Sequence, residues 1–110
     1  MSKEEMLETF LNVEPADRIV MLILVSFHLT IVSRDIFLSQ SNDKKLKSAT
    51  GIQEINHKIT SNVIDRLKGN NSRYPDNVLI EILFETFAAY ELNDYLSDVW
   101  NSSARKARAQ

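Results

Sequence analysis

The segment from Ile19 to Val32 constrains this chain most, because it has the pattern of a helix that is apolar on two faces. Its apolar residues are interrupted only at Ser26, His28 and Thr30. A helix with two apolar faces must be covered on two sides. The segment therefore predicts where the core lies, and we expect this helix to be the most buried element of the fold.

The charges that flank this segment argue against a membrane span. A spanning helix needs about 20 apolar residues. An extension to Leu38 would bring His28, Arg34 and Asp35 into the bilayer, where each is costly. We therefore expect a core helix of a soluble protein and no membrane.

The composition narrows the class of protein. The chain has 110 residues, two glycines, two prolines and no cysteine. This length suits one domain, and the scarcity of helix breakers predicts long helices. Without cysteine there is no disulfide, thiolate metal site or thiol nucleophile. This fits a reducing compartment, so we expect a cytoplasmic protein. The net charge of −2 argues weakly against general nucleic-acid binding.

Helix signals divide the chain into five segments. Ser2 and Glu5 match a capping box, and Pro15 suits the first turn of a helix. Polar residues 40–43 and the run Gly69–Ser72 mark turns. The predicted helices end near 11, 39, 68 and 90, and the last begins near 92 and passes Trp100. This predicts an all-α antiparallel bundle of about four main helices plus a short N-terminal helix, forming one domain over residues 1–100. Residues 101–110 are expected to be a basic, frayed tail.

The helical phase places the polar residues. One face of the third helix is apolar and contains Asn56; its residues are Ala49, Ile52, Ile55, Ile59, Val63 and Leu67. The second helix has two polar seams between its apolar faces. One seam holds Ser26, Thr30 and Ser33, and the other holds Asp17, His28, Asp35 and Ser39. In an antiparallel hairpin His28 falls level with Ile55, which predicts a hydrogen bond from His28 to Asn56. We take His28, Asn56 and Asp35 as the candidate buried polar cluster.

Weaker candidates for a site are Arg34, Glu54 and His57. Glu54 and His57 form one Glu-x-x-His pattern, whereas carboxylate-bridged metal bundles use two and further glutamates. Glu54 points away from the core face, so we interpret the pair as surface residues and expect no cofactor. Arg34 is expected to end the apolar stretch as a solvated residue, or to act in a dimer or ligand pocket. A metal or small-ligand site around His28 is an alternative that requires further inward ligands.

The segment Lys45–Ile52 resembles the middle of a helix-turn-helix DNA-binding motif. In that family the residue equivalent to Ala49 packs between the helices and the residue equivalent to Gly51 makes the turn. The next helix, which would begin at Ile52 here, enters the major groove. The resemblance implies a DNA-binding regulator. It departs from the family at Lys47, a position that is usually small, and at His57, where the family places a packed aliphatic residue.

The large apolar surface of the predicted helices is the main basis for the function that we expect. No nucleophile elbow or phosphate-binding glycine loop is present in the sequence. The second helix and the fourth, from Val78 to Phe87, are more apolar than their neighbours in a small monomer can cover. We expect a homodimer that works by protein–protein interaction, as a regulatory or adaptor module without catalysis.

Overall fold

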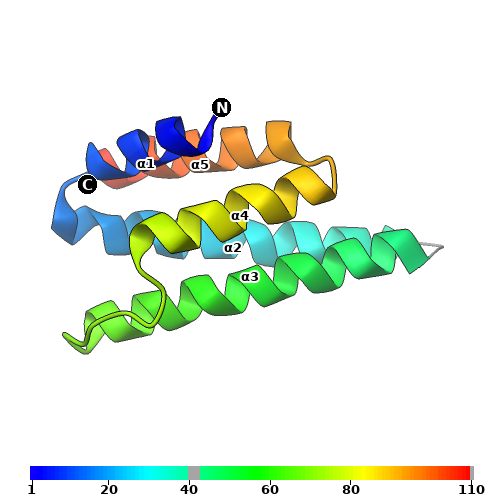
Figure 1. Ribbon diagram of the computed structural model, residues 1–110, viewed down its shortest axis with the longest axis horizontal. Coiled ribbons are helices and arrows are strands. Elements are labelled where there is room, and N and C mark those ends of the chain that lie inside the picture. Colours follow the sequence, from blue (N-terminus) through cyan, green and yellow to red (C-terminus); the bar gives the residue numbers. More distant parts are fainter. Residues whose placement is uncertain (40–42, 110) are drawn as a thin grey trace.

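The fold consists of helices throughout the described residues, which are 1–39 and 43–109 of a computed structural model. Figure 1 shows the five helices, α1 (Lys3–Leu11), α2 (Pro15–Ser39), α3 (Asp43–Leu67), α4 (Asp76–Ala89) and α5 (Asn93–Arg108). No strand occurs in these residues. The structure therefore confirms the all-α class. Of the turn expected at residues 40–43, residues 40–42 lie outside the described residues, and Asp43 is the first residue of α3.

The first helix begins at the predicted cap. The Ser2 hydroxyl accepts a hydrogen bond from the Glu5 amide at 3.1 Å, and the Glu5 carboxylate accepts one from the Ser2 amide at 3.2 Å. These two bonds satisfy amides that the helix leaves unpaired. The predicted capping box is confirmed, and α2 begins at the predicted Pro15.

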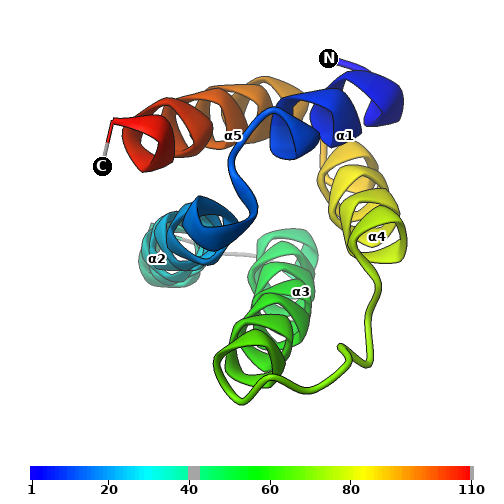
Figure 2. The same cartoon turned by 90° about the vertical axis from the view of Figure 1, so that its left-hand side faces the viewer.

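The helices form two layers around one core. Helices α2 and α3 lie side by side and run in opposite directions, and α1 and α5 lie across from them (Figures 1 and 2). Figure 2 shows α2, α3 and α4 close to end-on, whereas α5 crosses above α2 obliquely. The main neighbours of α2 are α3 and α5. Helices α3 and α5 thus cover two sides of α2.

Two expectations about burial are wrong. Helix α2 buries five of its 25 residues, whereas α5 buries six of its 16, so α2 is not the most buried element. Residues 101–110 were expected to fray, but α5 continues to Arg108. Ser103, Ala104 and Ala107 are buried against the other helices, and their small side chains let α5 approach closely. The basic residues of this segment stay on its outer side.

Phe10 joins three helices to α1. Its ring stacks on Trp100 of α5 with centroids 5.9 Å apart. The guanidinium groups of Arg18 and Arg66 lie 5.5 and 5.7 Å from the ring centroid, within the range of a cation–π contact. The Trp100 indole donates a hydrogen bond to the Met6 carbonyl at 3.0 Å. One aromatic ring therefore connects α1 to α2, α3 and α5.

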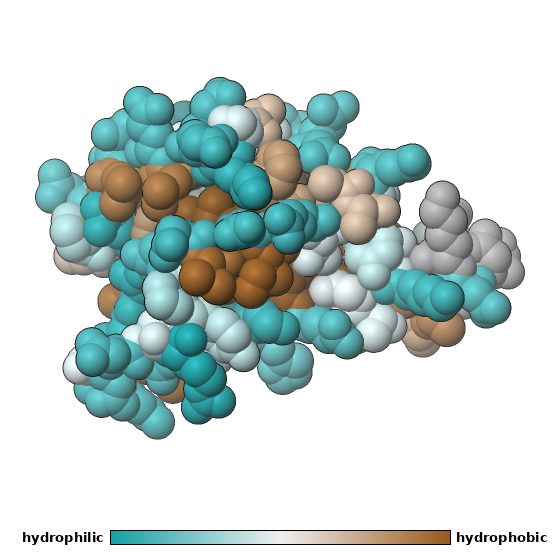
Figure 3. Space-filling model, viewed as in Figure 1, coloured by the Kyte–Doolittle hydropathy of each residue, from teal (hydrophilic) through white to brown (hydrophobic). Residues whose placement is uncertain are grey.

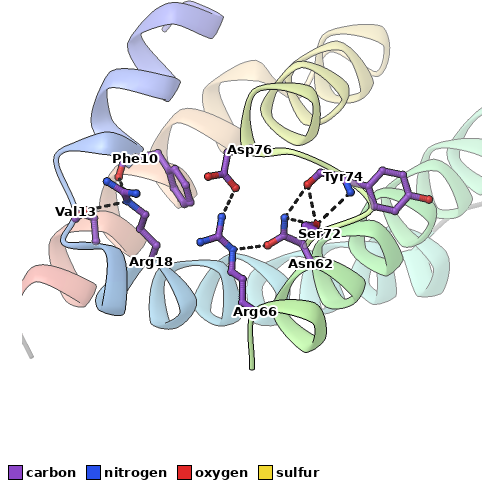
Figure 4. Close-up of polar contacts among 8 residues, drawn as sticks. All are labelled: Phe10, Val13, Arg18, Asn62, Arg66, Ser72, Tyr74 and Asp76. Carbon is purple, nitrogen blue, oxygen red and sulfur yellow. Dashed lines mark hydrogen bonds and ion pairs between the residues drawn. The ribbon is translucent and has the colours of Figure 1, made fainter. Parts of the chain in front are cut away.

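A buried amide fixes the connection from α3 to α4 (Figure 4). Asn62 is fully buried and donates hydrogen bonds to the Ser72 hydroxyl and the Tyr74 carbonyl, both at 2.9 Å. Its oxygen accepts a 2.7 Å bond from Arg66, which also pairs with Asp76 at the start of α4. This network lies at the turn predicted for residues 69–72, but its members were not singled out from the sequence.

We predict that Asn62→Ala destabilises the fold by about 1–3 kcal/mol, because it removes three hydrogen bonds of a fully buried amide and leaves the Arg66 Nε–H without its acceptor. Urea unfolding measures this change. Asn56→Ala is the matched control, since Asn56 is only half-buried. A cost for Asn62→Ala no larger than for Asn56→Ala would contradict the role of the network.

Gly51 lies in the middle of α3 beneath the side chain of Tyr90. A Cβ atom at this position would lie 2.6 Å from both the Tyr90 Cε2 and the Tyr90 hydroxyl oxygen. Atoms at this separation overlap, so the close approach of Tyr90 explains a glycine that otherwise weakens the helix.

Gly51→Ala is therefore predicted to stabilise the protein by about 0.5–1 kcal/mol only when Tyr90→Ala removes the ring. With Tyr90 present, the gain is expected to shrink or change sign, because the ring must move. A double-mutant cycle by urea unfolding measures the difference. An equal gain in both backgrounds would show that the contact has no energetic effect.

Candidate functional site: the outward faces of α2 and α3

The outward face of α2 carries a row of large apolar side chains that no other helix covers. Ile23, Phe27, Ile31 and Leu38 are 47, 63, 41 and 67% exposed. Residues at these spacings lie on one side of a helix, and Ala16, half-exposed Val20 and Arg34 share that side. We call these seven residues the α2 row.

The outward face of α3 carries a second, more polar row. Its members are all exposed and follow a spacing of three and four residues: Leu46, Thr50, Gln53, His57, Thr60, Ile64 and Leu67. We call them the α3 row. The row is apolar at its two ends and polar in the middle. Leu67, expected on the core face, is 66% exposed.

A polar groove of about 380 Å³ separates the two rows. Its lining includes Thr30, Arg34, Asn56 and His57. Asn56 accepts a 2.6 Å hydrogen bond from the Ser26 hydroxyl and donates a 2.9 Å bond to the Thr30 hydroxyl. These bonds link α2 to α3 through side chains at the floor of the groove.

The structure does not bring the candidate cluster of His28, Asn56 and Asp35 together. Asn56 uses the other polar seam of α2, through Ser26 and Thr30. His28 instead lines a second groove of about 460 Å³ between α2 and α5. The predicted hydrogen bond from His28 to Asn56 is therefore replaced. The reason is that α5, not α3, covers the side of α2 that bears His28.

Asp35 is also on the α5 side of α2, where its carboxylate acts on Tyr95. Burial raises the pKa of Tyr95 above its usual value, and the negative charge of Asp35 raises it further. Both effects favour the neutral phenol, which donates a 3.2 Å hydrogen bond to the His28 carbonyl. The Tyr95 phenol therefore links α5 to the backbone of α2 at the groove that His28 lines.

The weaker candidates lie at the surface. Arg34 and His57 face the polar groove, and both are exposed. Glu54 is exposed and lies beside a separate shallow pocket between α3 and α4. Within residues 1–39 and 43–109, no group of three or more His, Cys, Asp or Glu side chains could hold a metal ion.

The local resemblance to a helix-turn-helix motif is wrong in geometry. That motif needs a turn at Gly51, but α3 continues unbroken from Asp43 to Leu67. Gly51 is instead accounted for by the close approach of Tyr90. Ala49 and Ile52 are buried in the core of this single helix and do not separate two helices.

The long α2 helix also meets the length and hydropathy of a membrane span. It is the one such helix among the described residues, with a mean hydropathy of 1.8 over its most apolar 18 residues. The core helix of a soluble protein meets the same criteria. Here 28% of that window is buried, which again shows how much of α2 is uncovered.

Comparison with known proteins detects no relative of this chain. No family model matches it, and neither does any curated protein or solved structure. Its candidate site therefore rests on its own geometry.

On the face of the molecule where α4 lies in front, the apolar surface is less continuous than in the α2 row. Figure 3 shows apolar areas on this face that are divided by strips of hydrophilic side chains. Lys3 of α1 forms ion pairs of 3.6 Å with both Glu81 and Glu85 of α4. Val78 is the one strongly exposed large apolar residue of α4. The α2 row is therefore the stronger candidate for an interaction surface.

Ser26 and Thr30 were not predicted as the partners of Asn56. The signal was present, because these two residues and Ser33 form one recognisable polar seam of the second helix. Choosing between the two seams required knowing which one faces α3. That choice depends on where α5 packs, which no local pattern of α2 encodes.

We predict that Ser26→Ala and Asn56→Ala have non-additive effects on unfolding, with an interaction energy of about 0.5–1.5 kcal/mol. The reason is that each variant removes the same 2.6 Å hydrogen bond. His28→Leu with Asn56→Ala is the control pair and should be additive within about 0.5 kcal/mol. Urea unfolding of the single and double variants measures both. Coupling in the His28 pair alone would restore the arrangement expected from the sequence.

Proposed function

We propose that this protein is a non-catalytic interaction module that self-associates through the α2 row and the α3 row. The single observation that carries the proposal is the uncovered α2 row, in which Phe27 is 63% exposed. Soluble monomers rarely expose a continuous apolar surface of this kind. A second copy of the same chain covers it without any other component.

The polar groove supports association between proteins and not catalysis. The hydroxyls of Ser26 and Thr30 and the Asn56 amide are bonded to one another. Such a network fixes the relative position of two helices, and in an interface it favours one register over others. The groups that line the groove do not include a carboxylate that could act with His57 as an acid–base pair.

The proposed setting is the cytoplasm, with no membrane. The polar middle of the α3 row lies beside the α2 row, and lipid would leave the Gln53 amide and the His57 ring without the hydrogen bonds that water supplies. Arg34 within the α2 row adds a charge that lipid disfavours. The proposal therefore assigns the apolar surface to a protein partner.

Phe27→Ala is predicted to raise the dimer dissociation constant about 100-fold or more. Each dimer would lose two buried phenylalanines, at about 1.5–3 kcal/mol each. Sedimentation equilibrium of the full chain without detergent measures the constant. Leu11→Ala is the matched control, because Leu11 is 54% exposed but lies on α1 and should leave the constant unchanged.

A wild-type chain that stays monomeric at high micromolar concentration would overturn the proposal. A chain that remains in solution only with detergent or lipid vesicles would overturn it too, in favour of a membrane role for α2.

A further inference from the structure

We infer that the second copy packs face to face on α2 and α3, with a two-fold axis that passes Phe27 and His57. In this arrangement α2 lies antiparallel on α2 of the partner, and α3 lies on α3 of the partner. The inference rests on the self-association proposed above and specifies its geometry.

The α2 row is symmetric about Phe27. Its members lie four, seven and eleven positions before and after this residue. In an antiparallel pair centred there, Ile23 faces Ile31 of the partner and small Ala16 faces the large Leu38. Every apolar position then meets an apolar position, except where Arg34 faces Val20.

The α3 row is nearly symmetric about His57, which lies at about the same height along the hairpin as Phe27. It extends four, seven and eleven positions before His57 and three, seven and ten positions after it. The hydrogen bond from Ser26 to Asn56 and the one from Asn56 to Thr30 show that Phe27 and His57 are level across the hairpin. One axis can therefore relate both helices to their copies.

The distribution of polarity selects this arrangement over the other symmetric one. With the axis along the helices, the apolar α2 row would lie on Thr50, Gln53 and Thr60 of the partner and would bury the Gln53 amide against side chains that cannot bond to it. With α2 on α2, apolar side chains meet apolar ones and the polar middle of α3 meets itself.

The area suits a stable dimer. Helices of 25 residues are about 37 Å long, and two side by side are about 20 Å wide. Seen face-on, a layer of this size covers about 740 Å² per copy. The accessible surface of its side chains exceeds this projected area, so the layer can supply the about 800 Å² per partner that a standard interface buries. The α2 helix alone presents about half of this, so α3 is needed as well.

The charge of Arg34 provides a test of the antiparallel direction of the two α2 helices. Among residues 1–39 and 43–109 it has no ion-pair partner. The antiparallel pairing puts it opposite Val20 of the partner, about 4.5 Å along the helix axis from Asp17 of the partner. Asp17 lies on the seam of α2 that faces α5, about 60° around the helix from Val20, so the long Arg34 side chain reaches it at the edge of the interface. Two equivalent ion pairs can form in this way, one on each side of the axis.

The absence of cysteine allows a clean crosslinking test. In the inferred dimer, His57→Cys puts two thiols beside the axis, within the Cα separation of about 4.4–6.8 Å that a disulfide needs. Under mild oxidation of the full chain we expect disulfide-linked dimer at least about tenfold faster than with Glu8→Cys. Glu8 is the control because it is exposed on α1, in the other layer. Equal rates for the two variants would overturn the inference.

A charge exchange tests the ion pairs separately. Arg34→Glu or Asp17→Arg puts like charges on both sides of the axis, and each variant is expected to dimerise about tenfold more weakly. Mixing the two variants restores both pairs, so native mass spectrometry should show heterodimer well above the statistical half. A statistical mixture would overturn the antiparallel pairing.

The outcomes separate the two proposals. Suppose that the wild-type chain forms a dimer that Phe27→Ala weakens, but that the His57→Cys variant does not crosslink fast and no heterodimer excess is found. This result would overturn the geometry inferred here and would retain the proposed interaction module. A monomeric wild-type chain would overturn both.

Discussion

A long helix that is apolar around most of its circumference needs cover on every side, and a chain of five helices cannot supply it. Here α3 and α5 cover two sides of α2, so that Met21, Leu22, Val25 and Leu29 are buried. The third side has no neighbour among the described helices. The short α1 and the 14-residue α4 are used to close the core above α3 and α5. The uncovered α2 row is thus the direct result of how few helices the chain has for so much apolar surface.

Local chemistry made much of the fold predictable. The capping residue Ser2 and the proline at position 15 act within one or two turns, so the starts of α1 and α2 follow from neighbouring residues. The core face of α3 follows from periodicity for the same reason, except at Leu67. The prediction of a frayed tail was wrong because small residues such as Ala104 and Ala107 give little local indication that they are buried. They are buried only because other helices lie around them.

The candidate site was less predictable because it depends on which helix packs where. His28 and Ser26 lie on different sides of α2, and both seams were visible in the sequence. Because α5 packs on the side of α2 that bears His28, Asn56 of α3 forms its hydrogen bonds with Ser26 and Thr30. Gly51 shows the same limit, since a turn glycine and a glycine beneath an aromatic ring look identical along the chain. Contact between residues distant in sequence decided each case.

The hydrogen bond from Trp100 to the Met6 carbonyl joins residues 94 positions apart, and it has a consequence for the order of folding. Helix α5 is the last of the five to be synthesised, yet it covers one side of α2 and anchors α1 through Phe10. Until α5 emerges, α2 has α3 alone as a main neighbour. A growing chain therefore exposes more of α2 than the finished protein does, and contacts of long sequence separation slow its folding. The nascent chain is the form in which α2 is most open to unwanted association.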